Sequence, residues 1–281
     1  MSCDRVALIG HPVAHSLSPA LHAAAYEALG LHMHYELVDC PDEASVHAAV
    51  DALRGGHYLG LNVTLPWKRT ALSLADELGP SARRVGAANV LARDGERVLA
   101  HNTDLLALVE RLRVHGIGRG PALVLGGGGA ALAATAALTE LGATPWVLAR
   151  RFVERGARAL FAPLGASAIA PGAALDPGAP FRVVVQATSA GMSGRSPGED
   201  ILGWIDWDQV EPDALCLDVV YVPARTPFLE VARGRGRRSE GGLEMLIGQA
   251  AHSVALWTGR TPPVEAMRRA AHVALGPEAE S

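Results

Sequence analysis

A run of four glycines at residues 126–129 separates a short apolar segment, 122–125, from an alanine-rich segment, 130–142. The first segment is typical of a buried strand and the second of a helix. The spacing G-x-G-x-x-A is met by Gly126, Gly128 and Ala131. Glycines at such a turn leave the amides of the helix start open to a pyrophosphate. A flexible linker could also be rich in glycine, but the flanking strand and helix favour a dinucleotide site.

The nature of that dinucleotide is indicated about 20 residues further on, where NAD-binding proteins usually carry an acid for the ribose hydroxyls. Here the next apolar run, residues 145–149, is followed by Arg150 and Arg151. A guanidinium group is planar, stays charged and can donate two hydrogen bonds to a phosphate at once. The pair therefore favours NADP over NAD, although two arginines could also be a solvated helix start.

A second group of polar residues follows the apolar run at residues 58–64. Because a strand that meets Pro66 must stop there, Asn62, Thr64 and Lys68 fall at its carboxyl end, where open α/β sheets bind ligands. Lys68 opens a helix that we expect to continue through residues 69–78 (RTALSLADEL), and at a helix start the dipole favours anions rather than cations. On this observation alone, an ordinary surface lysine is the alternative.

Two serines and an aspartate begin other helices. Ser16 and Ser18 stand between a strand at residues 6–10 and a helix that starts at Pro19, where hydroxyls and free amides could bind a carboxylate. Ser18 could equally be a simple N-cap, and so could Asp104, which precedes the helix at 105–116.

The elements that must position these residues alternate along the chain. Apolar runs and amphipathic segments follow one another, which predicts α/β architecture with parallel strands and right-handed crossovers. Residues 215–221 (LCLDVVY) are expected to form one of these strands. Residues 93–96 (RDGE) join two short apolar runs, which indicates a hairpin. We expect domain boundaries near residues 104 and 238, and the last segments have the pattern of amphipathic helices.

Composition narrows the class of protein. The 281 residues are 49% hydrophobic with a net charge of -4, which is enough for two cores and gives no reason to expect a nucleic-acid partner. Three scattered cysteines, Cys3, Cys40 and Cys216, fit a reducing cytoplasm. No secretory signal or membrane-spanning run is recognised, so we expect no membrane partner. The histidines show no metal-ligand spacing, and we expect no metal.

Taken together, the motifs resemble those of the shikimate dehydrogenase family over nearly the whole chain. Besides the glycine turn, they are residues 10–19 (GHPVAHSLSP), 62–68 (NVTLPWK), 86–89 (GAAN), 102–104 (NTD), 187–189 (ATS), 218–221 (DVVY) and 242–249 (GLEMLIGQ). The family reduces 3-dehydroshikimate to shikimate with NADPH in the aromatic amino-acid (chorismate) pathway. Each motif alone is weak, but their combination in this order is specific.

The resemblance implies a fold and a set of site residues. It implies a substrate domain at residues 1–104, a Rossmann-type doubly wound NADP domain at 105–238, and C-terminal helices, 239–281, that return to the first domain. It makes Lys68 and Asp104 the catalytic pair. It assigns substrate binding to Ser16, Ser18, Asn62, Thr64, Asn89, Tyr221 and Gln249. It assigns cofactor binding to Gly126, Gly127, Gly128, Gly129, Ala130, Arg150, Arg151, Thr188, Ser189, Val219 and Gly242.

Such a pair suits the chemistry. Oxidising a secondary alcohol removes a hydride and a proton, and a lysine beside the hydroxyl can relay the proton or stabilise negative charge on the carbonyl oxygen. A nearby carboxylate would hold the lysine, and which group is the formal base stays open. We expect a small-molecule substrate, and a monomer or homodimer.

Some residues depart from the family pattern. The second nucleotide strand commonly continues as Asn-Arg-Thr, whereas this chain has Ala149-Arg150-Arg151. An amide ligand is lost, so the preference for NADP could be weakened or could be rebuilt through Arg151. A relative that prefers quinate or an aminoshikimate with NAD(P) is one alternative function, although Ser18 and Thr64 argue for shikimate. A catalytically silent NADP-binding sensor is another, and the presence of both Lys68 and Asp104 argues against it.

Overall fold

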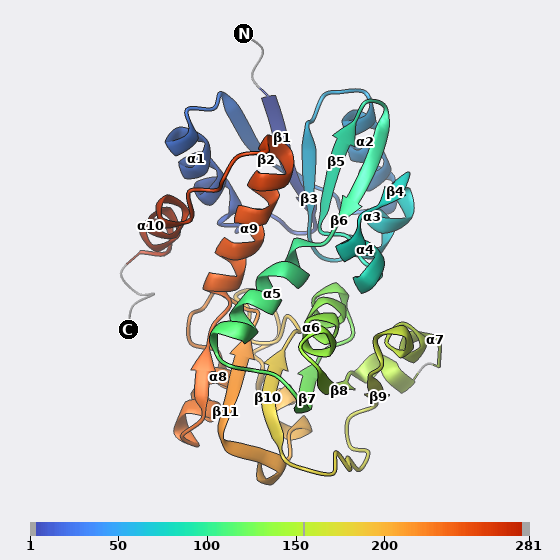
Figure 1. The fold of residues 1–281 in the computed structure, drawn as a ribbon, viewed down its shortest axis with the longest axis vertical. Coiled ribbons are helices and arrows are strands. Elements are labelled where there is room, and N and C mark those ends of the chain that lie inside the picture. Colours follow the sequence, from blue (N-terminus) through green and yellow to red (C-terminus); the bar gives the residue numbers. More distant parts are fainter. Residues whose placement is uncertain (1–3, 154, 277–281) are drawn as a thin grey trace. The chain divides into compact units, whose positions relative to one another are not determined.

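The computed structural model describes residues 4–153 and 155–276. The chain divides into two compact units: unit 1 is Met1–Ala107 with Ile247–Ser281, and unit 2 is Leu108–Leu246. Two helices, α5 (Thr103–Val114) and α9 (Leu243–Thr258), carry the chain from one unit to the other (Figure 1).

Unit 1 contains a six-stranded mixed sheet in the order β2-β1-β3-β5-β6-β4. Its strands are β1 (Asp4–Gly10), β2 (Met33–Asp39), β3 (Gly60–Val63), β4 (Glu77–Leu78), β5 (Val90–Asp94) and β6 (Arg97–His101). β1 pairs in parallel with β2 and β3, and the predicted hairpin is the antiparallel pair β5 and β6. Because Ile9 is opposite Val63, β1 and β3 end side by side, and the loops that follow them start together.

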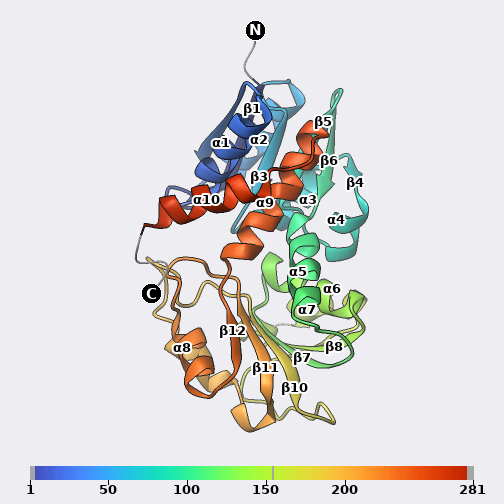
Figure 2. The ribbon, with the colours of Figure 1, turned by 60° about the vertical axis from the view of Figure 1, so that its left-hand side comes forward.

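Unit 1 also contains helices. They are α1 (Ser18–Leu29), α2 (Glu43–Arg54), α3 (Lys68–Leu74), α4 (Pro80–Val85) and α10 (Val264–Leu275), with the unit 1 parts of α5 and α9. Helix α2 starts with a capping box between Asp42 and Ser45, and it buries Val46, Val50 and Leu53 in the core. Helix α9 is tied to β5 by a hydrogen bond from Trp257 Nε1 to the Leu91 carbonyl, and α10 packs on α1 (Figure 2).

Unit 2 contains a six-stranded sheet in which every neighbouring pair is parallel, in the order β12-β11-β10-β7-β8-β9. Its strands are β7 (Gly120–Leu125), β8 (Ala143–Leu148), β9 (Ser167–Ile169), β10 (Phe181–Gln186), β11 (Val210–Asp218) and β12 (Arg238–Glu240). Counted from β7, this is the strand order 3-2-1-4-5-6 of a Rossmann sheet. The order reverses between β7 and β10, which is where such sheets bind dinucleotides.

Helical segments surround the second sheet. They are α6 (Gly129–Glu140), α7 (Arg155–Ala159), α8 (Pro227–Gly234) and the 3-10 turns η1 (Arg150–Val153), η2 (Ala162–Leu164), η3 (Glu199–Trp204) and η4 (Trp207–Gln209). Most of the alanines of α6 are buried, which explains why its sequence is apolar all round. Phe228 and Leu229 of α8 and Ile201 of η3 pack into a core with Leu125 and Val184 of the sheet.

Several predicted boundaries shift. The helix that begins at Lys68 ends at Leu74, because residues 77–78 form β4 and pair with β6. Strand β11 ends at Asp218 rather than Tyr221, because the Asp218 side chain accepts a hydrogen bond from the Val220 amide and turns the chain. Strand β12 extends the sheet of unit 2 beyond residue 238.

Two of the three cysteines lie in the described part of the chain. Cys40 and Cys216 are buried free thiols, and Cys3 lies outside the described residues. Among the helices that the structure describes, none combines the length and the apolar character that a membrane span requires.

Candidate active site

Lys68 and Asp104 meet in unit 1. Lys68 is the first residue of α3, and Asp104 lies in the first turn of α5. Lys68 Nζ donates a hydrogen bond to Asp104 Oδ2 at 2.5 Å, and the two side chains are only 15% and 6% exposed. A charge-assisted hydrogen bond in such a poorly solvated place compensates two charges that would each be costly to bury alone.

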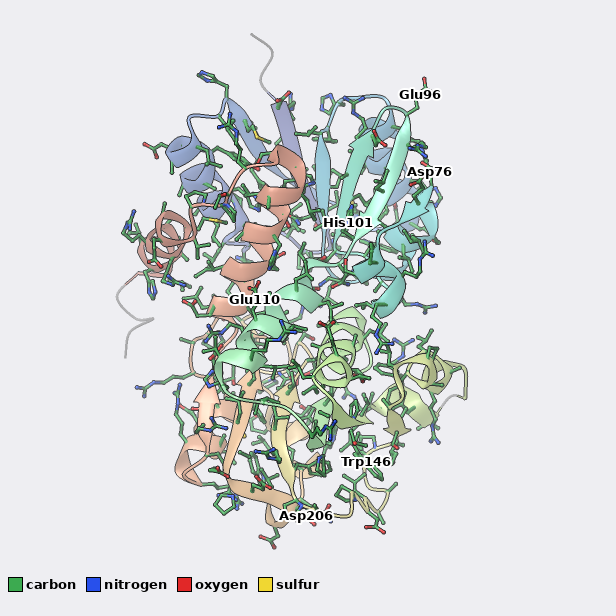
Figure 3. All side chains as sticks on the ribbon, viewed as in Figure 1. Asp76, Glu96, His101, Glu110, Trp146 and Asp206 are labelled. Atoms are coloured by element: carbon green, nitrogen blue, oxygen red, sulfur yellow. The ribbon has the colours of Figure 1, made fainter. Side chains whose placement is uncertain are left out.

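Asn89 holds the aspartate in place. Its Nδ2 donates to Asp104 Oδ1 at 2.9 Å, and its Oδ1 accepts from the Thr103 amide at 2.7 Å. Its own amide donates to the carbonyl of His101, which is labelled at the end of β6 in Figure 3. One carboxylate oxygen of Asp104 thus faces the lysine and the other faces a buried amide.

Asp104 is not the helix cap that it could have been. Asn102 Oδ1 accepts from the Leu105 amide at 3.0 Å, and Asn102 Nδ2 donates to the Ala87 carbonyl at 2.9 Å. The capping task therefore falls to Asn102. This leaves both oxygens of Asp104 for side-chain partners.

The loops after β1 and β3 lie against each other. A Cβ atom on Gly10 would lie 2.3 Å from Thr64 Cγ2, so only glycine fits at that position. The His11 amide donates to the Leu65 carbonyl at 2.8 Å. Thr64, half-buried in the second loop, is thereby brought to the same edge of the sheet as the first loop.

Ser16 and Ser18 hydrogen-bond to each other. Ser16 Oγ donates to Ser18 Oγ at 3.1 Å and accepts from the Ser18 amide at 3.2 Å. The N-cap alternative for Ser18 is wrong: Leu17 occupies the cap position with helical backbone angles, and Ser18 is the first helical residue. The amide of Ser18 is thus satisfied by the Ser16 hydroxyl, and Pro19 follows as the second helical residue.

Asn62 and Gln249 belong to a buried network. Asn62 Oδ1 accepts from the Tyr35 hydroxyl at 2.8 Å, and its Nδ2 donates to Ser253 Oγ at 3.0 Å. Gln249 Oε1 accepts from Asn89 Nδ2 at 3.4 Å. Tyr35 and Ser253 were not expected at the site. Ser253 lies one turn after Gln249 on α9, a spacing that could have indicated it, whereas Tyr35 carries no such signal.

The glycine turn in unit 2 has the shape that a pyrophosphate needs. Gly126 has φ +128°, and a Cβ atom there would lie 2.7 Å from the Ala187 carbonyl oxygen. Gly128 is the N-cap of α6, a Cβ there would meet open space, and no described side chain caps the helix. The amides of Gly129, Ala130 and the next residue therefore form an uncapped helix start at the switch point of the sheet.

Buried polar side chains end the two neighbouring strands. Gln186, at the end of β10, accepts from the Thr188 amide at 2.5 Å, and its Nε2 donates to Asp218 Oδ1 at 3.3 Å. Asp218, at the end of β11, accepts from Thr226 Oγ1 at 2.6 Å and from the Val220 amide at 2.9 Å. Burial raises the pKa of Asp218 to about 7, although these hydrogen bonds oppose the rise.

The remaining cofactor candidates lie on the loops that these side chains hold. Thr188 and Ser189 follow β10, and Val219 follows β11. A Cβ atom on Gly242 would lie 2.3 Å from the Val219 carbonyl oxygen, so that these two residues touch through their backbones. Tyr221, the one substrate candidate in unit 2, is half-buried in the loop between β11 and α8.

The two arginines point to different partners. Arg151 lies over the glycine turn, with its Nη1 donating to the Gly127 carbonyl at 3.1 Å. The side chain of Arg150 is 77% exposed, and its Nη1 lies 3.3 Å from Asp200 Oδ2. Asp200 comes from η3, fifty residues away in sequence, and no sequence motif indicated it.

The described part of the chain also bears on metal binding. Within it, no three histidine, cysteine, aspartate or glutamate side chains lie together as a metal site would require.

Comparison with known proteins identifies two family regions. Residues 8–91 match the model of the shikimate dehydrogenase substrate binding domain, and residues 242–272 match that of the shikimate 5'-dehydrogenase C-terminal domain. Among curated proteins, a shikimate dehydrogenase (NADP(+)) of Thermus thermophilus is 39% identical over 273 residues, which is 97% of this chain and 99% of the relative.

Solved structures agree. A shikimate 5-dehydrogenase of Thermus thermophilus in complex with NADP(H) and shikimate has a TM-score of 0.80 and 37% identity, covering 97% of this chain and 100% of the other. The Listeria monocytogenes enzyme in complex with shikimate and NAD has a TM-score of 0.80 and 27% identity, with 95% of each chain covered. On near-complete coverage at this identity, the chain belongs to the shikimate dehydrogenase family.

Proposed function

We propose that this protein is an NADP-dependent shikimate dehydrogenase that reversibly reduces 3-dehydroshikimate to shikimate in aromatic amino-acid biosynthesis. The observation that carries the proposal is the 2.5 Å contact between Lys68 and Asp104, two poorly exposed groups from distant parts of the sequence. Family membership supplies the substrate class. The pair supplies the acid–base chemistry that the reaction needs.

In the reduction, a carbonyl group gains a hydride on carbon and a proton on oxygen. NADPH, when bound, supplies the hydride. Lys68 donates a hydrogen bond to the carbonyl oxygen as negative charge builds there, and then delivers the proton. Asp104 holds the ammonium group in position, and Asn89 holds Asp104. In the oxidation the same pair accepts the proton of the substrate hydroxyl.

The other polar residues of unit 1 orient the substrate. Ser16 and Ser18 bind its carboxylate, with hydroxyl groups that already lie 3.1 Å apart. Holding a ring by several hydrogen bonds places the reacting carbon for hydride transfer, which lowers the entropy cost of the step. The ring hydroxyls are bound by Asn62, Thr64, Asn89 and Gln249. Tyr221 is the remaining substrate-binding candidate.

The residues of unit 2 fit NADP. The uncapped start of α6 and residues 126–130 bind the pyrophosphate, and Thr188, Ser189, Val219 and Gly242 hold the nicotinamide end. Support comes from the positive φ of Gly126, the open space at Gly128 and the Rossmann strand order. Arg150 and Arg151 bind the 2′-phosphate, because guanidinium groups recognise phosphate oxygens with paired hydrogen bonds.

One assay tests the function. Purified protein is mixed with shikimate or quinate and with NADP⁺ or NAD⁺, and the absorbance of the reduced cofactor is followed. We expect the highest kcat/KM with shikimate and NADP⁺. A higher kcat/KM with quinate would show that shikimate is not the preferred substrate. If no mixture produced reduced cofactor, the proposed enzyme activity would be wrong.

The location and assembly are further parts of the proposal. We place the protein in the cytoplasm, where the buried thiols of Cys40 and Cys216 stay reduced. We expect it to act as a monomer or homodimer, which light scattering on the purified protein measures directly.

A further inference from the structure

Arg150 contacts two residues of η3. Its Nη1 lies 3.3 Å from Asp200 Oδ2, and its guanidinium carbon lies 5.9 Å from the ring centroid of Trp204. Asp200 also accepts a hydrogen bond from Ser196 Oγ at 3.3 Å through its other oxygen. The carboxylate and the indole ring thus contact the same guanidinium group.

These contacts differ in their effect on a phosphate. The ring face of Trp204 attracts the cation without accepting a hydrogen bond from its N–H groups, so it leaves these donors available for a phosphate. Asp200 uses Nη1, one of the donor nitrogens that a phosphate would use. It also carries a negative charge, which a 2′-phosphate with a charge between about −1.5 and −2 would have to approach.

Asp200 could help phosphate binding by ordering Arg150, or oppose it by repelling the phosphate, and the larger of the two effects decides the outcome. Arg150 and Asp200 are 77% and 43% exposed, and an exposed ion pair gains little from holding a side chain in one geometry. Repulsion between a carboxylate and a phosphate dianion that share one guanidinium group acts over a few ångströms and grows with the product of the charges. The repulsion therefore exceeds the gain from ordering the arginine.

The ribose of the cofactor is a second group that an acid near Arg150 could contact. NAD-binding proteins place an acid where it can accept hydrogen bonds from the ribose hydroxyls, usually at the end of the second strand. In this chain β8 is followed by Ala149, Arg150 and Arg151, and the acid beside them comes from η3 instead. Asp200 thus contacts Arg150, the residue that we assign to the 2′-phosphate. A carboxylate, however, is suited to accept a hydrogen bond from a free ribose hydroxyl.

We infer that Asp200 and Trp204 set the preference of this enzyme between NADP and NAD through opposite actions on Arg150. Asp200 lowers the affinity for the 2′-phosphorylated cofactor, and Trp204 raises it. This inference rests on the proposed function, in which Arg150 binds the 2′-phosphate. It concerns residues outside the glycine turn and outside the arginine pair itself.

The test uses the purified full-length protein and calorimetric titration with NADP⁺ and NAD⁺, which needs no turnover. Asp200→Asn is expected to tighten NADP⁺ binding by about 3- to 10-fold without tightening NAD⁺ binding, as removal of one nearby charge from a dianion site predicts. The gain should shrink in high salt, because screening weakens the repulsion that the substitution removes. Glu199→Gln removes the exposed acid that precedes Asp200 in η3; as the matched control, it should change NADP⁺ binding by less than about twofold.

Trp204→Leu should act in the opposite direction. We expect NADP⁺ binding to weaken by about 2- to 5-fold with NAD⁺ binding unchanged, the range of an exposed cation–π contact. Adenosine 2′,5′-bisphosphate and AMP, titrated in the same way, should reproduce both changes, since the effect belongs to the phosphate end.

The outcomes separate this inference from the proposed function. If wild-type protein oxidises shikimate with NADP⁺ but Asp200→Asn leaves NADP⁺ binding unchanged or weaker, the inference is wrong and the function stands. Equal tightening for NAD⁺ would also overturn it. If Arg150→Ala weakens both cofactors equally, the phosphate role of Arg150 fails first, and the inference fails with it. A protein that oxidises shikimate with neither cofactor would instead reject the proposed function.

Discussion

At the scale of single residues, the site depends on side chains that are released from backbone tasks. Lys68 comes immediately after a turn that ends β3, and Asp104 is relieved of helix capping by Asn102. Asn89 then orients Asp104 through a buried amide. A lysine and an aspartate from separate elements are thereby held 2.5 Å apart with little solvent around them.

The first prediction concerns Lys68. In the proposed mechanism Lys68 donates the proton, so we expect Lys68→Ala to lower kcat by about 10²-fold or more while shikimate still binds. Steady-state kinetics and calorimetric titration with shikimate measure the two effects. Arg69→Ala, which changes the next and more exposed cation on α3, should leave kcat nearly intact. Turnover that survives largely unchanged in Lys68→Ala would remove the acid–base role.

A second residue-scale prediction concerns Arg150. If Arg150 binds the 2′-phosphate as proposed, Arg150→Ala removes a contact that NAD does not make, so KM for NADP⁺ should rise by about 10-fold and KM for NAD⁺ by much less. Initial rates at saturating shikimate with each cofactor give the comparison. A parallel rise for both cofactors would mean that Arg150 supports the local fold rather than the phosphate.

At the scale of elements, Asp218 links three pieces of unit 2. It ends β11, accepts from Thr226 at the N-cap of α8, and accepts from Gln186 at the end of β10. The loops that carry Thr188, Val219 and Tyr221 start at these strand ends. A fully buried carboxyl group therefore sets the starting directions of two loops that the proposed function uses.

Asp218 also predicts a dependence of stability on pH. The pKa of Asp218 is about 7 in the folded protein and 3.8 in the unfolded chain. The contribution of this carboxyl group to the free energy of unfolding is therefore complete below pH 3.8 and is lost as the pH rises through about 7. Asp218→Asn should therefore lower the free energy of unfolding more at pH 5 than at pH 8, by a difference on the order of 2 kcal/mol. Urea unfolding at the two pH values measures it.

The control for this prediction lies on the same strand. Asp213→Asn changes an exposed acid of β11 and should shift stability equally little at both pH values. If Asp218→Asn has the same cost at pH 5 and pH 8, the carboxyl group does not titrate in that range and its predicted effect on stability is wrong.

Most of the fold could be predicted from local sequence patterns, because a strand, a glycine turn and a helix are each encoded within a few residues. Residues 122–142 were predicted as such a unit, and β7 and α6 confirm it. The end of α3 was predicted wrongly, since Leu78 is drawn into a strand by its pairing with Ala100, a partner that local pattern does not reveal.

The same limit applies to the candidate site. Lys68 and Asp104 could be named from motifs, and their contact needed the tertiary fold. Tyr35 and Asp200 could not be named, because each acts on a residue 27 or 50 positions away and has no characteristic neighbours. Pairings of this kind depend on how strands are ordered, not on periodicity along one segment.

At the scale of the whole molecule, the chain passes between the units through α5 and again through α9. Inside unit 2, the end of α5 and strand β12, which precedes α9, are linked by hydrogen bonds. Glu240 of β12 accepts from Arg111 Nε and Nη2 at 2.8 Å each, and His115 Nε2 contacts it as well. Burial works against the charge of Glu240, but the hydrogen bonds from Arg111 and His115 outweigh it and lower the pKa of this carboxyl group.

This cluster leads to the last prediction. Arg111→Met leaves Glu240 buried without its bidentate partner, so we expect the free energy of unfolding to fall by about 3 kcal/mol at pH 7. The same helix offers a control in Arg113, whose pair with Glu140 is 3.8 Å long and largely exposed, and Arg113→Met should cost less than about 1 kcal/mol. Urea unfolding midpoints with unchanged slope compare the two variants.

The pH dependence makes the comparison specific. Because the folded-state pKa of Glu240 lies below 4.5, its stabilisation is complete above that pH and is lost as the pH falls through the folded value. The difference between wild type and Arg111→Met should therefore shrink in acid, whereas that of Arg113→Met stays small throughout. Equal costs for the two arginines at pH 7 would show that the cluster at Glu240 contributes no more than a surface ion pair, and that it does not join the two connections energetically.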